Sequence, residues 1–510
     1  MSRTVVLVVL DGWGVGDHNR GNPIYSQRPQ SIEYCRRHFP AGALQASGIA
    51  VGLPWEEAGS SEISHLVIGA GRTVYQPYPR ISLAVRDGSF FSNPTLLAAA
   101  DHATASGGSL HLVGLLSESN SDASREHLDA LIKFTSDRSL PYWLHLITDG
   151  VDSSRSATDL ISTLPDPSRV ISLFGRYYAM DEDDHWDRIG SCYRALTDPA
   201  VPSLEISTLF TASRASGGDQ YIAPSPVNAH HPVKDGDALI FFNFREDGLR
   251  ELVSPFADPQ FSEFKTVSFS NLFVATFSRY SRDFKATVAF ETDLPQTPLG
   301  RVLSAAGKTQ LKIGETIKYS SLTYFFNGFR EAPYKNEYRV LIPSTSTPHP
   351  ESSPALRAAD ITARALQSIN ERAFDFIVVN YANPDIIGRT GNLTAAEDAV
   401  RVLDGELNKI IRASLESGAT LIIMGSHGNM ERMVNPLTGE SETGNTANPV
   451  PIYLLGREFQ TVKNDIRLSA EEQTTSGIIS DVSPMILKLF DISLPSDMTD
   501  SNLLKLLQNP

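Results

Sequence analysis

Short apolar segments alternate with amphipathic segments along most of this chain, and this alternation constrains the fold more than any other feature. The first apolar run, Val5 to Leu10, contains no polar residue. Such continuity is typical of a central parallel strand that is covered on both faces. Strands that alternate with helices build βα units and therefore mostly parallel sheets. The sequence predicts an α/β protein.

The predicted elements fall into two groups. In the first group we expect strands at 109–116, 142–147, 170–174 and 238–244, and helices at 94–105, 124–134, 186–196 and 248–256. In the second group we expect strands at 375–380, 420–424 and 451–455, and helices at 357–372 and 394–417. Two prolines within 76–79 predict a stiff linker. A second segment that contains two prolines, 292–298, interrupts the alternation of strands and helices again. We therefore predict that residues 77–295 form a domain inserted into a domain of residues 1–76 and 296–510.

Residues 59–72, with the sequence GSSEISHLVIGAGR, are polar, then apolar, then rich in glycine. This order predicts a loop-to-helix junction that carries Ser61. A helix N-terminus presents free N–H groups and partial positive charge, both of which suit a phosphoryl group. The alternative is an ordinary helix cap, in which Ser61 or Ser64 only starts the helix.

Asp11 follows the first predicted strand directly. Ligands of open α/β sheets collect at the carboxyl ends of the strands, so this aspartate is placed for chemistry. A turn aspartate would explain the same position without any function.

The net charge and the cysteine content indicate which partners and which cellular compartment to expect. The chain has 44 basic and 59 acidic residues, a net charge of −15, which disfavours binding to nucleic acid or anionic membranes. The two cysteines, Cys35 and Cys192, are far apart and predict no disulfide framework. The apolar run at the N-terminus is too short for a membrane span and lacks a signal-cleavage pattern. We expect a cytoplasmic protein with neither nucleic-acid nor membrane partners.

Motifs in collinear order extend over nearly the whole chain. They are LDGW at 10–13, the segment 52–80 around Ser61, GRYYAMD at 175–181, FNFR at 242–245, ETIKY at 315–319, NYANPD at 380–385, HGN at 427–429 and NPVP at 448–451. Together they resemble the cofactor-independent phosphoglycerate mutases of the alkaline phosphatase superfamily. This resemblance implies an alkaline-phosphatase-like parallel-sheet domain with a second, substrate-binding α/β domain inserted into it.

The resemblance also implies roles for individual residues. Ser61 matches the serine that takes the phosphoryl group and touches a metal. Asp11, Asp385 and His427 match metal ligands, and Lys318 matches a lysine of the catalytic and substrate-binding set. In many phosphatases two metal ions, about 3.5–4 Å apart, supply the positive charge that phosphoryl transfer needs.

Three metal-ligand positions depart from the family pattern. Arg389 and Asn445 replace histidines, and Ser426 replaces an aspartate. Arginine stays protonated and offers no lone pair, and asparagine is a poor substitute for imidazole. We expect Arg389 to pair with Asp385, an attraction of about 4 kcal/mol at about 4 Å and an effective dielectric constant near 20, before desolvation. The alternative for Arg389 is a solvated loop cation.

These changes determine the expected metal content. We expect no metal at full occupancy, and at most one divalent ion, manganese or zinc, on Asp11, Ser61 and His427. The first metal site would keep only Asp385 of its protein ligands.

The implied substrate positions are only partly kept. Asp152, Arg188, Arg245 and Lys318 match the family, whereas other positions hold residues of different charge: Asp122 for histidine, and Val151, Glu182 and Gly248 for arginine. The remaining cations could hold a phosphate or carboxylate. The two acidic replacements oppose a highly anionic acid such as phosphoglycerate.

Two functional hypotheses follow from these residues. The first, which the sequence favours, is a non-catalytic relative of the mutases that binds a small phosphorylated or anionic ligand or has a regulatory role. The second is a phosphoryl-transfer enzyme, mutase or phosphatase, of altered substrate, with Ser61 as phosphoryl acceptor and at most one metal. Ordinary mutase activity is the least favoured outcome.

Overall fold

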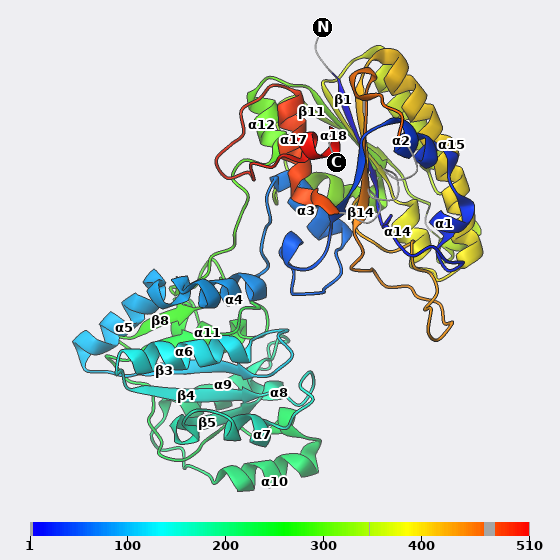
Figure 1. Ribbon diagram of the computed structural model, residues 1–510. Helices are drawn as coiled ribbons and strands as arrows, with labels where there is room; N and C mark the ends of the chain where they lie inside the picture. Colours follow the sequence, from blue (N-terminus) through cyan, green and yellow to red (C-terminus); the bar gives the residue numbers. More distant parts are fainter. Residues whose placement is uncertain (1–3, 346, 464–474, 509–510) are drawn as a thin grey trace. The chain divides into compact units, whose positions relative to one another are not determined.

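The computed structural model describes residues 4–345, 347–463 and 475–508 (Figure 1). The chain divides into two compact units, one within Met1–Tyr75 and Asp293–Pro510 and the other Gln76–Thr292. We call them unit 1 and unit 2. Each has its own sheet with flanking helices, so the α/β prediction is confirmed.

The sheet of unit 1 has the strand order β11-β10-β12-β1-β13-β14-β2-β15. Its strands are β1 (Val5–Leu10), β2 (Ala41–Gln45), β10 (Gln310–Glu315), β11 (Glu337–Ile342), β12 (Phe376–Tyr381), β13 (Thr420–Gly425), β14 (Val450–Leu455) and β15 (Thr475–Ile478). All neighbours are parallel except β14, which is antiparallel to β13 and β2. The sheet is therefore mixed, although its central part is parallel as expected.

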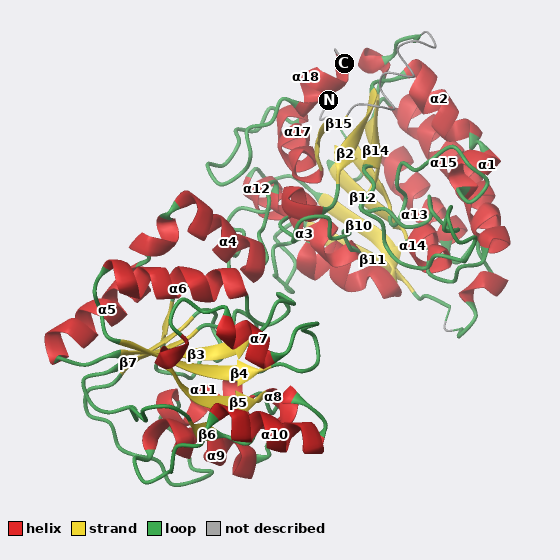
Figure 2. Cartoon of the chain, turned by 60° about the horizontal axis from the view of Figure 1, so that its bottom comes forward, coloured by secondary structure: helices red, strands yellow, loops and turns green. Residues whose placement is uncertain are grey.

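Helices cover both faces of this sheet (Figures 1 and 2). They are α1 (Pro23–Gln27), α2 (Gln30–His38), α3 (Ser61–Ala70), α12 (Leu299–Ala305), α13 (Ala358–Glu371), α14 (Asn383–Gly388), α15 (Leu393–Ser417), α17 (Val482–Leu489) and α18 (Leu503–Gln508). Val6, Val8 and Leu10 of β1 pack with α2, α13 and α15, whereas Val5, Leu7 and Val9 pack with α3, α12 and α17. Burial on two faces explains why β1 is apolar at every position.

Unit 2 has the strand order β6-β5-β4-β3-β7-β8-β9. Its strands are β3 (Leu110–Leu116), β4 (Tyr142–Thr148), β5 (Val170–Gly175), β6 (Ser225–Pro226), β7 (Ala238–Phe241), β8 (Phe273–Thr276) and β9 (Thr287–Val288). Its helices are α4 (Pro77–Asp87), α5 (Pro94–Ser106), α6 (Arg125–Asp137), α7 (Ala157–Ser162), α8 (Arg176–Ala179), α9 (Trp186–Thr197), α10 (Ile206–Ser216) and α11 (Arg250–Ala257). Only β6 runs antiparallel to its neighbour.

Two expectations about unit 2 are wrong in detail. Pro77 and Pro79 do not form a stiff linker but lie in the first turn of α4. Proline is tolerated there because the first N–H groups of a helix have no intrahelical partner. The strand expected at 238–244 ends at Phe241, and the amides of Phe244 and Arg245 donate to the Asp122 carbonyl instead.

Within the described residues, no helix combines the length and the apolar character that crossing a bilayer requires.

A buried histidine of unit 2 makes the stability of that unit sensitive to acid. His127 on α6 lies among the rings of Tyr78, Phe244 and Phe277, and burial lowers its pKa to about 3. The unfolded side chain takes a proton below about pH 6.5 while the folded one stays neutral, so stability is lost as the pH falls below that value. We expect His127 to account for a loss of about 2 kcal/mol at pH 5.

Urea unfolding at pH 7 and pH 5 measures this contribution. The variant His127→Phe should lose less stability on acidification than the native protein, because phenylalanine has no proton to gain. The control His349→Gln removes a histidine whose side chain is 75% exposed and should leave the pH difference unchanged. An equal loss in the native protein and in His127→Phe would contradict the assignment.

Candidate functional site

The sheet of unit 1 brings the predicted metal and nucleophile positions together. Asp11 follows β1, Lys318 follows β10, and His427 follows β13. These strands and β12 are parallel neighbours, so their carboxyl ends lie at one edge of the sheet. Asp385 is the third residue of α14, the helix that follows β12. All four side chains are buried.

Ser61 is the first residue of α3, but it does not cap the helix. The cap is Ser60, whose hydroxyl accepts from the amide of Ile63. The alternative that Ser61 or Ser64 is only a capping residue is therefore wrong. The Ser61 hydroxyl is free to donate to Asp11 Oδ2 at 2.9 Å and to accept from Lys318 Nζ at 2.7 Å.

Lys318 lies between the two aspartates of the site. Its Nζ is 2.5 Å from Asp385 Oδ2 and 3.0 Å from Asp11 Oδ2. Burial alone lowers the pKa of Lys318, but the two carboxylates outweigh burial and raise it. Burial raises the pKa of each aspartate, and Lys318 and His427 outweigh that effect and lower both values. All three groups are charged at neutral pH.

Arg389 directly follows α14 and forms the predicted ion pair. Its Nε lies 2.8 Å from Asp385 Oδ1, and its Nη2 donates to Asn445 Oδ1 at 3.2 Å. The side chain is 48% exposed, so the guanidinium is partly solvated but held in place. Asn445 also donates to the Gly59 carbonyl at 2.7 Å and accepts from Asn429 at 3.1 Å.

Ser426 and His427 complete the network around the aspartates. The Ser426 hydroxyl donates to Asp11 Oδ1 at 2.5 Å and accepts from the Gly12 amide at 3.3 Å. His427 Nε2 lies 3.2 Å from Asp385 Oδ1, and its Nδ1 lies 2.9 Å from Ser426 Oγ. Burial alone lowers the pKa of His427, but Asp11 and Asp385 raise it to about 9.

This donor set does not fit two divalent ions. Every carboxylate oxygen of Asp11 and Asp385 already contacts a donor of the protein itself. Lys318 and Arg389 carry protons on their nitrogens and cannot ligate a metal. In the part of the chain that the structure describes, no group of three or more His, Cys, Asp or Glu side chains is arranged to hold an ion.

Sequence reasoning quoted His65 and Asn380 within motifs but did not predict that they support Ser61 and Asp11. His65 Nδ1 lies 2.7 Å from the Ser61 carbonyl, one helical turn earlier. Its Nε2 accepts from Asn380, which also donates to Asp11 Oδ2 at 3.4 Å. Burial lowers the pKa of His65, so this histidine is neutral and donates through Nδ1. The spacing of four residues on one helix was the available signal.

A second missed residue is Glu431, a buried acid in the loop after β13. It accepts from the amides of Gly14 and Asn429, at 3.0 and 2.8 Å, and from the side chains of Thr446 and Asn448. One carboxylate thereby ties together the loops that carry Trp13 and His427. No spacing rule in the sequence identifies such a backbone tie.

The remaining predicted substrate residues lie in unit 2, where each cation has an acidic partner. Arg188 pairs with Asp181 at 2.6 Å, and Arg245 pairs with Asp247 at 2.8 Å. Asp152 pairs with an arginine that sequence reasoning left unassigned: Arg176 lies 2.7 Å from Asp152, 2.8 Å from Asp149 and 3.5 Å from Asp122. These ion pairs neutralise the arginines within unit 2 itself.

Comparison with known proteins shows the family of the chain. The Metalloenzyme superfamily profile matches residues 3–494. A 2,3-bisphosphoglycerate-independent phosphoglycerate mutase of Pseudomonas entomophila (strain L48) is 36% identical over 514 residues, covering 98% of both chains. The protein of the same description from Pseudomonas putida (strain GB-1) is 35% identical over 521 residues, again covering 98% of both chains.

A solved structure supports the fold in the same way. The phosphoglycerate mutase of Leishmania mexicana, determined at low cobalt concentration, superposes with a TM-score of 0.53 and 23% sequence identity. The match covers 98% of this chain and 97% of the other. At this level of identity the likeness concerns the fold alone.

Proposed function

Since the chain belongs to the 2,3-bisphosphoglycerate-independent phosphoglycerate mutase family and to the metalloenzyme superfamily, we propose that it is a member without ordinary two-metal mutase activity. In this proposal it binds a small phosphorylated or anionic ligand and acts as a binding or regulatory protein. No nucleic acid or membrane takes part.

The observation that carries the proposal is the closed ion-pair network at Asp385. Lys318 holds one carboxylate oxygen at 2.5 Å, and Arg389 holds the other at 2.8 Å. A divalent ion at this carboxylate would have to displace Arg389 and would face its positive charge. Two further histidine ligands would help such an ion to displace Arg389. The chain has neither of them, because Arg389 and Asn445 occupy those two positions.

The ion pairs of the unit 2 arginines also argue against phosphoglycerate as the ligand. Arg188 and Arg245 each hold an aspartate of their own unit, and Arg176 holds three. A strongly anionic ligand would have to break these pairs and would meet Asp122 and Glu182. A less acidic ligand costs less electrostatic free energy.

Ser61 and Lys318 give the ligand a place to bind. The N-terminus of α3 contributes partial positive charge, and Lys318 lies 2.7 Å from the Ser61 hydroxyl. One phosphate or carboxylate group held there without any metal would accept hydrogen bonds from Lys318 in competition with Asp11 and Asp385.

The second candidate is a phosphoryl-transfer enzyme of altered substrate. It is favoured by the position of Ser61 between Asp11, which accepts a hydrogen bond from the hydroxyl and orients it, and Lys318, which can stabilise charge on a phosphoryl oxygen. Asp11, Ser61 and His427 would hold at most one manganese or zinc ion, which would polarise the phosphoryl group.

An assay with 2- and 3-phosphoglycerate tests the main proposal. With added manganese we expect turnover well below about 1 s⁻¹, the low end for ordinary enzymes. Turnover at or above that rate would contradict it.

A second measurement separates the two candidates. The protein is incubated with p-nitrophenyl phosphate and analysed by mass spectrometry, with Ser61→Ala as the control. Phosphorylation of Ser61 in the native protein alone would favour the transferase, and its absence would favour the binding protein.

A further inference from the structure

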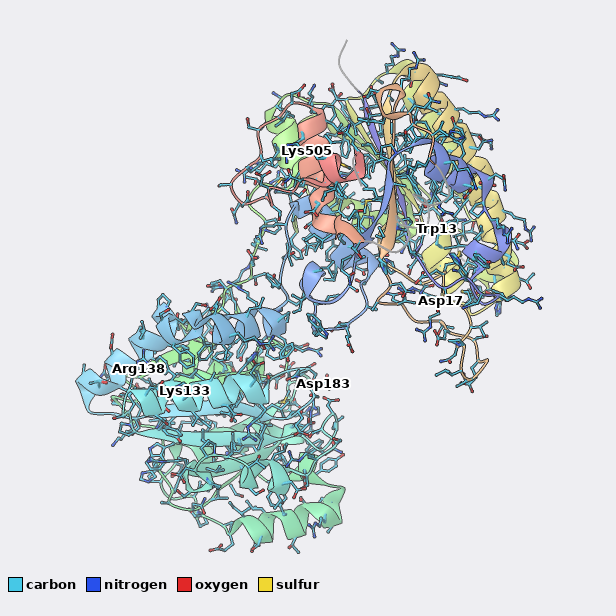
Figure 3. All side chains as sticks on the ribbon, viewed as in Figure 1. Trp13, Asp17, Lys133, Arg138, Asp183 and Lys505 are labelled. Atoms are coloured by element: carbon cyan, nitrogen blue, oxygen red, sulfur yellow. The ribbon has the colours of Figure 1, made fainter. Side chains whose placement is uncertain are left out.

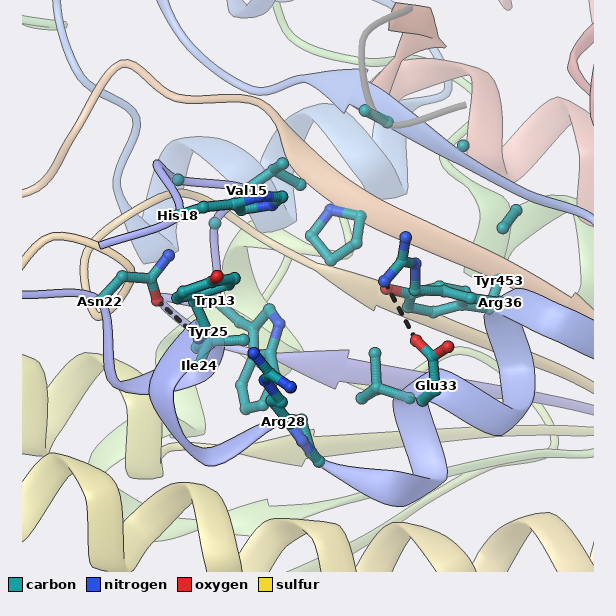
Figure 4. A pocket seen from close by; sticks show the side chains of 18 of the residues that line it. Trp13, Val15, His18, Asn22, Ile24, Tyr25, Arg28, Glu33, Arg36 and Tyr453 are labelled. Carbon is teal, nitrogen blue, oxygen red and sulfur yellow. Dashed lines mark hydrogen bonds and ion pairs between the residues drawn. The ribbon is translucent and has the colours of Figure 1, made fainter. Parts of the chain in front are cut away.

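A cavity of about 450 Å³ lies in unit 1, and its lining includes none of Asp11, Ser61, Lys318, Asp385 and His427 (Figure 4). It is lined by the loop after β1, helices α1 and α2, and strands β2 and β14, and it is open to solvent on one side. Its volume lies within the range of about 300–1,000 Å³ that small-molecule sites occupy. None of the functions considered above uses it.

Aromatic rings form one side of this pocket. His18 and Tyr25 are stacked, with ring centroids 4.6 Å apart and planes inclined by 8°, and Trp13 lies next to them (Figure 4). The opposite side includes Tyr453, and the small residues Ala41, Gly42 and Ala43 of β2 leave the space open. A pocket that has aromatic rings on its sides and small residues between them suits a planar ring system.

The charged groups at the pocket are unequal in number. Glu33 pairs with Arg36 at 3.1 Å. Arg28 lies over the ring of Tyr25, 5.8 Å from its centroid, and its guanidinium has no acidic partner within the described residues. Two arginines and one glutamate line the pocket, and Arg28 is the arginine that Glu33 does not contact. A guanidinium that is unpaired beside aromatic rings is suited to a carboxylate, sulfonate or phosphate group.

We propose that this pocket binds a planar aromatic molecule that carries a single anionic group. The ring system packs against the His18–Tyr25 pair, and the anionic group accepts hydrogen bonds from Arg28. A single guanidinium that Glu33 does not contact favours a monoanion over a multiply charged nucleotide. The proposal is independent of the function assigned to Ser61 and Lys318, because none of those residues lines the pocket.

A pair of matched probes tests the charge and the ring separately. 8-Anilinonaphthalene-1-sulfonate carries the required anionic group, and N-phenyl-1-naphthylamine has the same ring system without it. Fluorescence titration of the full-length protein should show one site that prefers the sulfonate. Arg28→Gln should weaken binding of the sulfonate about tenfold or more and leave the neutral probe unaffected.

The control variant changes an arginine in the same kind of setting elsewhere. Arg138 lies 4.1 Å over the ring of Phe134 in unit 2 (Figure 3), and Arg138→Gln should alter neither titration. Ala43→Leu fills the pocket and should weaken both probes; if it fails to fold, Arg28→Gln still decides. Equal affinity for the two probes, or unchanged sulfonate binding in Arg28→Gln, would overturn the proposal.

Discussion

The combined variant Arg389→His, Ser426→Asp and Asn445→His is expected to bind manganese or zinc at least about a hundredfold more tightly than the native protein. Each change supplies a ligand where the structure shows a competing donor. Histidine at 389 removes the cation that lies 2.8 Å from Asp385 Oδ1, and aspartate at 426 replaces the hydroxyl that donates to Asp11. Histidine at 445 replaces an amide with an imidazole lone pair, which divalent transition metals prefer.

The single variant Arg389→Gln is the control, because it removes the positive charge without adding a strong ligand. We expect it to bind metal only slightly better than the native protein. Equal binding by the native protein and the triple variant would show that positions 389, 426 and 445 do not face a metal site. We expect the triple variant to show no mutase activity, because Asp122, Val151, Glu182 and Gly248 are unchanged.

The second large effect is expected from Lys318→Met. This change leaves Asp11 and Asp385 buried without the ammonium that contacts both of them. Breaking a buried ion pair by removing one partner typically costs about 3–5 kcal/mol, and we expect a loss of that size in the free energy of unfolding at pH 7.5. Chemical denaturation measures it.

Two comparisons make this prediction specific. The control Lys308→Met removes a more exposed lysine, 3.3 Å from Asp375, and should cost about 1 kcal/mol or less. Adding Asp385→Asn to Lys318→Met should restore part of the stability, because only one buried carboxylate then lacks its counter-charge. A loss below about 1 kcal/mol in Lys318→Met would show that Arg389 and His427 suffice.

The pH dependence of unfolding tests the role of Lys318 in a second way. In the native protein the pKa values of Asp11 and Asp385 are lowered, so their ion pairs stabilise the fold above the unfolded value near 3.8 and are lost as the pH falls below it. Without Lys318 at least one of the two carboxylates should bind a proton more readily in the folded state. Lys318→Met should therefore recover part of its lost stability between pH 7.5 and pH 5.

Much of the fold follows from local pattern. The strand Val5–Leu10 was predictable because alternate residues pack on the two faces of one sheet, which leaves no polar position. The direction of β14 was not predictable, because a buried strand has the same apolar pattern whether it runs parallel or antiparallel. Pro77 and Pro79 were misread because proline at the start of a helix and proline in a linker look alike in sequence.

The candidate site was predictable only as far as motifs reach. The positions of Asp11, Ser61, Asp385 and His427 came from matching segments, and the sheet brings them together. The role of Ser60 as the cap and the ties made by Glu431 depend on backbone geometry that no spacing encodes. Arg176 was quoted within a motif without a role, because its three aspartate partners come from separate loops.

We propose that the ion pairs of Asp385 leave no room for the family's two-metal centre. The most direct test is elemental analysis of the native protein after incubation with manganese and zinc and exhaustive dialysis. We predict less than one ion per chain, with none at Asp385 and only weak binding at Asp11, Ser61 and His427. Two tightly held ions per chain would contradict the account.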